Sequence, residues 1–285
     1  MRGHQEIKCH IIFDVKMDFT RKARFVAGGH VTEAPSSITY SSVVSRESVK
    51  IAFLIAALNN LDIMSCDIGN AYLNAPCREK IWFVAGKECG PDLEGKPCKL
   101  VRALYGLKSS GAAWRAMFSN FIINTLGFLP TCIDPDVYYR KNCRPNGSAY
   151  YEYVLVYVDD VLAISHDPTT IMKGIGEHFT IKDDKYGPPT TYLGANIEQI
   201  QLDDGSWAWS MTSKYYVKNL IDTVSDLLAE DGRELKGTFK QKSHTGPLPV
   251  TYAPELDDTQ ECLEKHASRY RQIIGILRWA TLKWL

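Results

Sequence analysis

The sequence lacks a long apolar run. Its longest, at residues 51–58, has eight residues, whereas a membrane-spanning helix needs about 20. A secretory leader is also missing, because residues 1–6 lead into no extended apolar region. These two absences exclude a membrane-spanning protein and predict an intracellular, cytoplasmic chain with no membrane partner, for which access to the nucleus stays open.

The sequence also lacks cysteine pairs and net charge. None of its eight cysteines forms a Cys-x-x-Cys pair, so we expect free thiols rather than a disulfide framework or a zinc module. Lys plus Arg equals Asp plus Glu, 33 each, which taken alone argues against a nucleic-acid binder. Residues 21–24, 96–115 and 265–285 nevertheless contain basic residues and no acid. Ordinary solvated faces would explain any one cluster, and the three together predict a phosphate-binding surface.

The 285 residues are 45% apolar and 23% charged, which is typical of a globular chain with one large domain or two small ones. Apolar periodicity predicts strands and helices along the whole length, with loops at 85–98 and 231–260. Predicted strands lie at 9–15, 23–26, 61–67, 81–84, 150–158, 161–165, 192–200 and 207–211. Predicted helices lie at 46–60, 110–126, 169–178, 213–230 and 265–285.

Two adjacent acids, Asp159 and Asp160, stand inside an apolar, β-prone segment at residues 153–164. A buried carboxylate is unfavourable, and two neighbouring carboxylates also repel each other. The pair therefore either lies in water at a hairpin turn, where aspartate is a favoured residue, or binds a divalent cation. Asp67 ends another short apolar strand, so three carboxylates converge if the two strands are neighbours. Such a set suits two Mg²⁺ ions roughly 3.5–4 Å apart, the apparatus of polymerases and nucleases.

Seven sequence blocks carry a more specific signal. They are Lys-Ala-Arg-Phe-Val-Ala at 22–27, Tyr-Ser-Ser-Val-Val-Ser-Arg at 40–46, Asp-Ile-Gly-Asn-Ala-Tyr-Leu at 67–73, Leu-Tyr-Gly-Leu-Lys at 104–108 with Ala113-Trp114, Tyr-Val-Asp-Asp at 157–160, Tyr-Leu-Gly at 192–194 and Tyr-Arg-Gln-Ile-Ile-Gly at 270–275. In order and rough spacing the chain resembles the reverse transcriptase domain of copia-type LTR retrotransposon polyproteins over about residues 8–285.

The resemblance implies an α+β fold of the right-hand polymerase type, with fingers, a palm built on an antiparallel sheet, and the start of a thumb. The expected parts are fingers at 1–66 leading into a palm strand, a palm motif at 67–74, the return of the fingers at 75–104, a palm with two hairpins at 105–200, and a thumb-like helical region at 201–285. The pattern at 265–285 has no helix stop signal. We therefore expect a C-terminally truncated unit of a longer polyprotein, whose other segments would be partners.

The implied activity is that of an RNA-directed DNA polymerase, a nucleotidyltransferase that adds deoxynucleotides to a primer 3′-OH on an RNA or DNA template. Its cofactor would be two Mg²⁺ ions, with Mn²⁺ as the alternative. By motif, Asp67 and Asp159 resemble the metal-bridging aspartates, and Asp160 is their acidic neighbour.

The resemblance also implies binding residues. Lys22 and Arg24 resemble the finger cations that grip the triphosphate, and Tyr72 resembles the aromatic residue that stacks under the incoming sugar and excludes a 2′-hydroxyl. The remaining nucleotide-binding positions are the Ile68 carbonyl, Tyr105 and Gly106. The primer grip would be Tyr192, Leu193 and Gly194, although core packing competes as the interpretation of Tyr192 and Leu193.

The sequence departs from the family at three places. Residues 109–111 read Ser-Ser-Gly where Gln-Ala-Pro is usual, residues 27–29 read Ala-Gly-Gly where Ala-Arg-Gly is usual, and the turn at 16–20 is short. These departures put the detail of the pocket in doubt. The second hypothesis is a catalytically inactive, truncated remnant that only binds nucleic acid, and it is based on the expected truncation, the short turn at 16–20 and the lack of an RNase H segment. An aspartic protease built on residues 67–69 is excluded, because the residue after the aspartate carries no hydroxyl.

Overall fold

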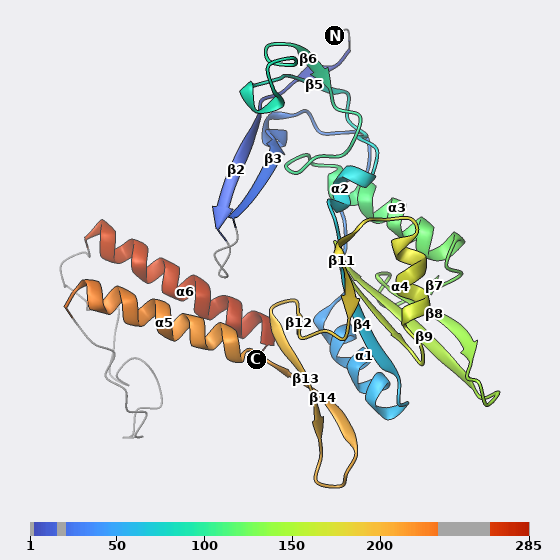
Figure 1. The fold of residues 1–285 in the computed structure, drawn as a ribbon. Helices are drawn as coiled ribbons and strands as arrows, with labels where there is room; N and C mark the ends of the chain where they lie inside the picture. Colours follow the sequence, from blue (N-terminus) through green and yellow to red (C-terminus); the bar gives the residue numbers. More distant parts are fainter. Residues whose placement is uncertain (1–2, 16–20, 233–262, 285) are drawn as a thin grey trace. The chain divides into compact units, whose positions relative to one another are not determined.

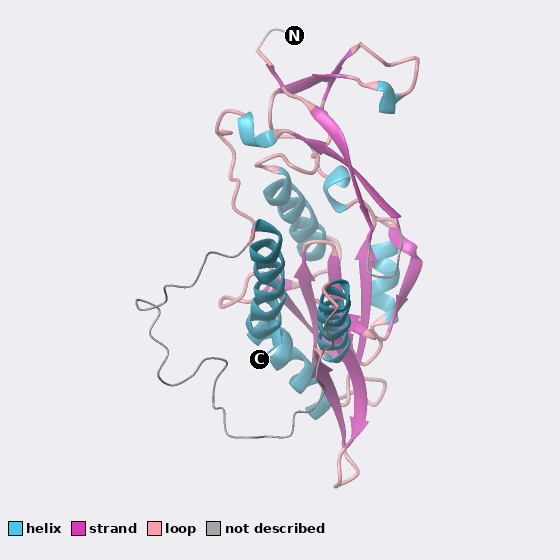
Figure 2. Cartoon of the chain, turned by 90° about the vertical axis from the view of Figure 1, so that its left-hand side faces the viewer, coloured by secondary structure: helices cyan, strands magenta, loops and turns pink. Residues whose placement is uncertain are grey.

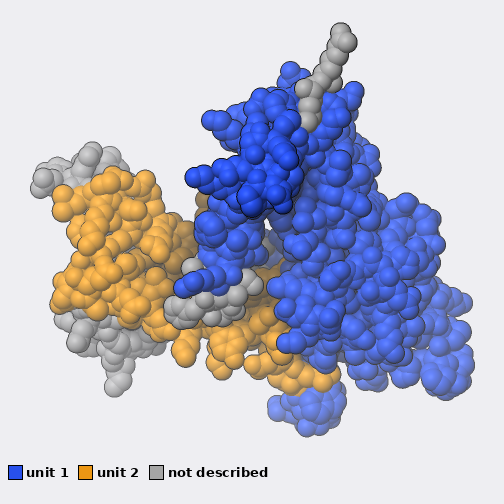
Figure 3. Space-filling view, turned by 45° about the horizontal axis from the view of Figure 1, so that its top comes forward, with its two compact units in different colours: residues 1–189, 201–209 blue, residues 190–200, 210–285 orange. Residues whose placement is uncertain are grey.

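The computed structural model describes residues 3–15, 21–232 and 263–284. These residues form two compact units, which Figure 3 colours separately. Unit 1 contains residues up to 189 together with 201–209, and unit 2 contains 190–200 and the residues from 210 onward. In the described parts of the chain, no helix has the length and apolar character needed to cross a membrane.

Unit 1 is built around a six-stranded sheet with the order β11-β4-β10-β9-β8-β7, in which every neighbouring pair is antiparallel (Figures 1 and 2). The strands are β4 (Asp62–Ile68), β7 (Leu129–Pro130), β8 (Val137–Cys143), β9 (Ala149–Tyr157), β10 (Asp160–Ser165) and β11 (Ile181–Gly187). Strand β10 and the second half of β9 contain valine, leucine and isoleucine, which favour strands buried on both faces, whereas the first half of β9 is rich in tyrosine.

Helices cover both faces of this sheet. Helices α3 (Ser110–Asn124) and α4 (Thr169–Gly176) pack on one face through a core that includes Trp114, Phe118 and Met172. Helix α1 (Arg46–Leu58) contacts β10 and buries Val49, Ala52, Phe53 and Ala56. Because side chains alternate along a strand, the buried residues Leu155 and Leu162 face the side opposite to the α3 and α4 core.

The rest of unit 1 contains two small sheets with a core of their own. The first has the order β1-β5-β6, with β1 (Gln5–Glu6) parallel to β5 (Ile81–Val84) and β5 antiparallel to β6 (Pro97–Lys99). The second is the hairpin of β2 (Cys9–Val15) and β3 (Arg21–Ala27). Short helices lie at Gly29–Val31 (η1), Ala71–Asn74 (α2) and Lys87–Cys89 (η2).

Unit 2 consists mainly of the helices α5 (Lys214–Glu230) and α6 (Glu264–Trp284). These helices pack together, and the Tyr216 hydroxyl donates a 3.0 Å hydrogen bond to the Ile276 carbonyl. The strands β12 (Thr191–Tyr192), β13 (Ala195–Gln201) and β14 (Trp207–Thr212) form a third small sheet, and the unit boundary passes through its β13–β14 hairpin.

The fold is a mixture of helices and antiparallel sheets, which agrees with the predicted α+β class at this coarser level. All five predicted helices are confirmed, with ends displaced by at most two residues. Strands β1, β6, β7, β8 and β11 were not predicted, and a turn at residues 193–194 divides the strand predicted at 192–200 into β12 and β13. The loop predicted at 85–98 is interrupted by η2 and by the start of β6. The loop predicted at 231–260 lies largely outside the described residues. The short turn at 16–20 also lies outside them.

Candidate active site

The three predicted catalytic aspartates come from two neighbouring strands. Asp67 stands near the end of β4, and Asp160, the first residue of β10, lies directly opposite it in the β4–β10 register. Directly opposed residues of an antiparallel pair point to the same face. Asp159 precedes Asp160 in the turn from β9, and its carbonyl accepts a 2.8 Å hydrogen bond from the Ile68 amide. The condition for the three carboxylates to converge, that the two strands are neighbours, is therefore met.

The turn between β9 and β10 has unusual backbone geometry. Residues 157–160, which we call the aspartate turn, include Val158 at φ 59°. This left-handed conformation is unfavourable for a β-branched residue and is concentrated at functional sites. The Val158 carbonyl accepts a 2.7 Å hydrogen bond from the Trp114 indole. Trp114 is 1% exposed and stacks on Phe118, with the ring centroids 5.0 Å apart. A buried and packed indole therefore holds the strained turn.

The electrostatics of the three carboxylates reflect their crowding. Burial, followed by the charges of Asp159 and Asp67, raises the pKa of Asp160 to about 6. Burial and the charge of Asp67 also raise the pKa of Asp159, although nearby Lys22 and Lys182 act in the opposite direction. The three groups thus lie within electrostatic range of one another and carry an excess of negative charge, which a bound cation would relieve.

Lys182 contacts this cluster and was missed in the sequence. Its ammonium lies 3.2 Å from Asp67 Oδ2, and the hydrogen bond raises the pKa of Lys182. The following aspartates, Asp183 and Asp184, have φ values of 56° and 51°, and the β11–β4 register shifts at this point. A bulge of this kind redirects side chains. The sequence signal would have been one lysine beside two acids, which is indistinguishable from a solvated turn.

The donor chemistry of the site fits Mg²⁺. Three crowded carboxylates, of which Asp159 and Asp160 have raised pKa values, supply the hard oxygen ligands that this ion requires. Among the residues that the structure describes, no three histidine, cysteine or acidic side chains already stand in a metal-binding arrangement. Lys182 contacts one oxygen of Asp67, so it would compete with a metal ion for that oxygen.

Two predicted nucleotide-binding residues, Tyr72 and Tyr105, contact each other. Their ring centroids are 4.9 Å apart. For both hydroxyls, burial and then the charge of Asp159 raise the pKa. The structure thus brings the two rings together and within electrostatic range of the carboxylates.

A close backbone crossing holds Tyr105 in place. The Ala27 amide of β3 donates a 2.8 Å hydrogen bond to the Tyr105 carbonyl. Next to it, Gly106 has φ 92°, and a Cβ built there would lie 2.1 Å from the Ala27 carbonyl oxygen. A Cβ on Gly29 would come equally close to the Gly106 carbonyl oxygen. These backbones can therefore approach only because both positions are glycine.

The predicted cations Lys22 and Arg24 are two residues apart on β3, so they project from the same side of the hairpin. The charge of Lys22 acts on Asp159, and that of Arg24 acts on Tyr105. Arg24 also lies 3.8 Å from Asp14 on β2. The hairpin thus carries positive charge within electrostatic range of the negative cluster.

The predicted primer-grip residues lie in unit 2. Leu193 and Gly194 form the two-residue turn between β12 and β13, with φ values of 48° and 83°. Positive φ at both central residues is typical of a tight type I′ hairpin turn. Tyr192 is buried, at 3% exposure, which agrees with the competing core-packing interpretation. The primer-grip role stays a prediction.

The predicted phosphate-binding clusters contain cations that have other partners. Arg115, in the 96–115 cluster, forms a 2.7 Å ion pair with the buried Asp136. Arg269, in the 265–285 cluster, pairs with Glu230 and Asp231. A phosphate would have to compete with these carboxylates for the two arginines, and the phosphate-binding role of the clusters stays a prediction.

The chain belongs to the reverse transcriptase (RNA-dependent DNA polymerase) family, whose model matches residues 2–225. Within that family it is similar to Pol polyproteins of copia-type retrotransposons, as the sequence blocks predict.

Three such relatives illustrate the similarity. The chain is 27% identical over 317 residues to the retrovirus-related Pol polyprotein from transposon TNT 1-94 of Nicotiana tabacum, covering 100% of the chain and 23% of the relative. It is 29% identical over 265 residues to the retrovirus-related Pol polyprotein from transposon RE1 of Arabidopsis thaliana, which covers 90% of the chain and 16% of the relative. It is 26% identical over 283 residues to the transposon Ty1-NL2 Gag-Pol polyprotein of Saccharomyces cerevisiae, which covers 98% of the chain and 15% of the relative. The chain thus spans less than a quarter of the length of these curated relatives.

Proposed function

We propose that the chain is the polymerase part of a copia-type Pol polyprotein and adds deoxynucleotides to a primer 3′-OH on an RNA or DNA template. The observation that carries the proposal is the register of Asp67 opposite Asp160, with Asp159 beside them and the pKa values of Asp159 and Asp160 raised by burial and mutual repulsion. In this proposal the six-stranded sheet is the palm, the β2–β3 hairpin belongs to the fingers, and α5 and α6 begin the thumb.

The carboxylates act as ligands in this proposal. Asp67, Asp159 and Asp160 would hold two Mg²⁺ ions, with the Ile68 carbonyl as a further oxygen. Bound there, the ions supply activation of the primer 3′-OH and neutralisation of the leaving pyrophosphate. The protein's own contribution is positional, since the pairing of β4 with β10 fixes two of the three carboxylates relative to each other.

Positive charge on the β2–β3 hairpin would bind the triphosphate. Lys22 and Arg24 share one side of β3, and their charges act on Asp159 and Tyr105 respectively. Charge-assisted hydrogen bonds to phosphate are about twice as strong as neutral ones. These residues would therefore orient the triphosphate toward the ligands and add to the stabilisation of charge in the transition state.

The contact between Tyr72 and Tyr105 supports a role in sugar selection. A ring held within range of Asp159 would collide with a 2′-hydroxyl and tolerate a 2′-hydrogen. In single-nucleotide extension, Tyr72→Ala should raise kcat/KM for ribonucleotides relative to deoxynucleotides, whereas Tyr72→Phe should change the ratio little. An unchanged ratio in an active Tyr72→Ala enzyme would remove this role.

The primary test is primer extension by the full chain on an RNA template with a DNA primer, deoxynucleotides and Mg²⁺. We expect template-dependent extension that Asp67→Asn lowers by at least about 100-fold. Binding of template–primer, measured separately by fluorescence anisotropy, should survive the substitution. If the wild-type chain binds template–primer and does not extend it, the nucleic-acid-binding remnant is the better account.

A further inference from the structure

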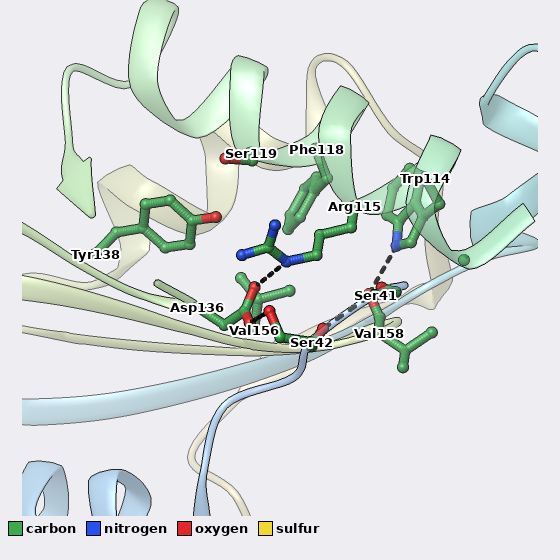
Figure 4. A pocket seen from close by; sticks show the side chains of 11 residues that line it. Ser41, Ser42, Trp114, Arg115, Phe118, Ser119, Asp136, Tyr138, Val156 and Val158 are labelled. Atoms are coloured by element: carbon green, nitrogen blue, oxygen red, sulfur yellow. Dashed lines mark hydrogen bonds and ion pairs between the residues drawn. The ribbon is translucent and has the colours of Figure 1, made fainter. Parts of the chain in front are cut away.

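A buried ion pair outside the carboxylate cluster lies next to the aspartate turn. Asp136, at 1% exposure, precedes β8, and its Oδ1 lies 2.7 Å from Arg115 Nε on α3. Its other carboxylate oxygen accepts a short hydrogen bond from the Ser42 hydroxyl. Figure 4 shows the Arg115 and Ser42 side chains converging on Asp136, with Val156 of β9 beside them. Nothing in the proposed chemistry uses these groups.

The main chain of Asp136 connects this ion pair to β9. The Asp136 carbonyl accepts a 3.0 Å hydrogen bond from the Val156 amide, and the Val156 carbonyl accepts one of 3.0 Å from the Val44 amide. Both main-chain groups of Val156 are therefore bonded to the loop before β8 and to the segment around Ser42. Val156 stands two residues before the strained Val158, so its position sets where the aspartate turn begins.

Helix α3 holds the turn at a second point. Trp114 bonds the Val158 carbonyl, and the next residue, Arg115, bonds Asp136. One turn of one helix thus contacts the aspartate turn directly and, through Asp136, the strand that leads into it. A shift of the Arg115–Asp136 pair would move Val156 relative to Trp114 and alter the path of residues 157–160.

The space around the pair is too small for a ligand. The pocket that Ser42, Arg115 and Asp136 share has a volume of about 10 Å³, which is room for about one water molecule. A buried ion pair also adds little stability over an apolar replacement, because desolvation offsets the attraction. Neither ligand binding nor stability therefore explains a charged pair at this point.

We propose that Asp136, Arg115 and Ser42 are positioning residues, which fix the aspartate turn in the geometry that nucleotide addition requires. This inference rests on the proposed role of Asp159 and Asp160 as ligands. The three residues act at a distance: Ser42 and Arg115 orient Asp136, Asp136 holds Val156, and Val156 with Trp114 sets the conformation of residues 158–160.

The same sheet provides a matched control pair. Arg140 and Glu152 form a 2.7 Å ion pair between β8 and β9, with side-chain exposures of 32% and 3%, compared with 29% and 2% for Arg115 and Asp136. Glu152 lies on the same strand as Val156 but bonds Arg140, Tyr150 and Ser165 rather than the segment next to the turn. Breaking the Arg140–Glu152 pair should lower the free energy of unfolding about as much as breaking the Arg115–Asp136 pair, without displacing the aspartate turn.

The experiment compares the full-length variants Asp136→Asn, Ser42→Ala and Glu152→Gln with the wild type. Single-nucleotide extension gives kcat and KM, urea unfolding gives stability, and amide hydrogen exchange reports on peptides covering residues 154–161. We expect Asp136→Asn and Ser42→Ala to lower kcat by about 10- to 100-fold, since a displacement of about 1 Å has this effect. The KM for deoxynucleotide and the Kd for template–primer should change less than about threefold, and exchange at the turn should rise. Glu152→Gln should leave kcat within about twofold.

An equal loss of kcat in Glu152→Gln, or unchanged exchange at the turn in Ser42→Ala, would overturn the proposal. Ser42→Ala removes one hydroxyl from a half-buried side chain, so it keeps the test decisive if Asp136→Asn does not fold. If the wild type extends no primer, the proposed function fails on that result alone, and the exchange data still decide whether these residues position the turn.

Discussion

The β9–β10 and β13–β14 hairpins each carry two adjacent aspartates, Asp159-Asp160 in one and Asp203-Asp204 in the other. In the first, burial and like charge raise the pKa of Asp160 to about 6. In the second, hydrogen bonds from the hydroxyl and amide of Ser206 hold the pKa of Asp204 below its usual range.

The difference arises from the surroundings and not from the dipeptide. Asp204 is fully exposed and accepts its hydrogen bonds from a residue two positions away. Asp160 is largely buried and faces a third carboxylate, Asp67, in the strand register. The backbone differs as well: positive φ falls on Gly205 in one turn and on Val158 in the other. Crowded negative charge and backbone strain together favour the first hairpin as the functional one.

Replacing one aspartate in each hairpin should give the largest contrast. In the proposed function Asp159 is a metal ligand, so we expect Asp159→Asn to lower primer extension by at least about 100-fold. Asp204→Asn changes only a local hydrogen bond in water and should leave extension within about twofold. Extension rates of the two purified variants provide the measurement. Equal losses would show that the comparison between the hairpins has no functional meaning.

The strained turn should depend on its tryptophan. Trp114→Phe leaves the Val158 carbonyl without its 2.7 Å hydrogen bond in a buried place, and the free energy of unfolding should fall by about 1–3 kcal/mol. Trp207, which is exposed beside the second turn, is the control, and Trp207→Phe should stay within about 0.5 kcal/mol of the wild type. Urea titration of both variants tests this, and similar losses would contradict it.

The two hairpins should respond oppositely to pH in metal-free protein. Folding raises the pKa of Asp160 from about 4 to about 6, so the folded state binds more protons and stability falls as pH rises through this interval. Asp160→Asn should therefore be stabilising by roughly 1–2 kcal/mol at pH 8, after allowance for screening, and by almost nothing at pH 4.

Asp204 supplies the control of opposite sign. Its lowered pKa means that its contribution is present above its unfolded pKa and is lost as pH falls through the folded value. Asp204→Asn should consequently be destabilising at pH 8, and this loss should shrink as pH falls through the folded pKa. Thermal unfolding in chelator across this range measures both variants, and parallel pH profiles would contradict the assignment.

The smallest effect is expected at Lys182. The side chains of Lys182 and Asp67, which form an ion pair, are 46% and 39% exposed. Lys182→Gln should therefore change the free energy of unfolding by less than about 1 kcal/mol. The substitution removes a competitor for Asp67 Oδ2, and Mn²⁺ should bind about two- to fivefold more tightly. Electron paramagnetic resonance of free Mn²⁺ measures this affinity. Weaker binding in the variant would show that Lys182 assists the site instead.

The sequence was sufficient for the helices and for the carboxylate cluster. Apolar periodicity places α1 and α3 correctly, and the sequence blocks that carry the resemblance group Asp67 with Asp159 and Asp160, whose strands the structure pairs. These predictions hold because the signals are local: a period, a turn and a charge inside an apolar segment.

The partners of individual charges could not be predicted. Arg115 pairs with Asp136, 21 residues away at the start of a strand whose sequence, Tyr-Tyr-Arg-Lys-Asn-Cys after Val137, is too polar to indicate burial. Lys182 meets Asp67 beside a bulge at which Asp183 and Asp184 adopt left-handed conformations. Such contacts depend on tertiary distances and on local backbone geometry that other residues can override.

The crossing of Gly29 and Gly106 has a consequence for inheritance. A glycine codon has two guanines at its first two positions, and every missense change there introduces a residue with a Cβ. At either position that carbon would lie 2.1 Å from a carbonyl oxygen of the facing backbone, whatever the chemistry of the rest of the side chain. We therefore expect a saturation mutagenesis scan selected for extension to be empty at these two positions. Copies of the sequence that drift without selection should lose activity through single-base changes at these two codons, even where the change alters no charge and no proposed metal ligand.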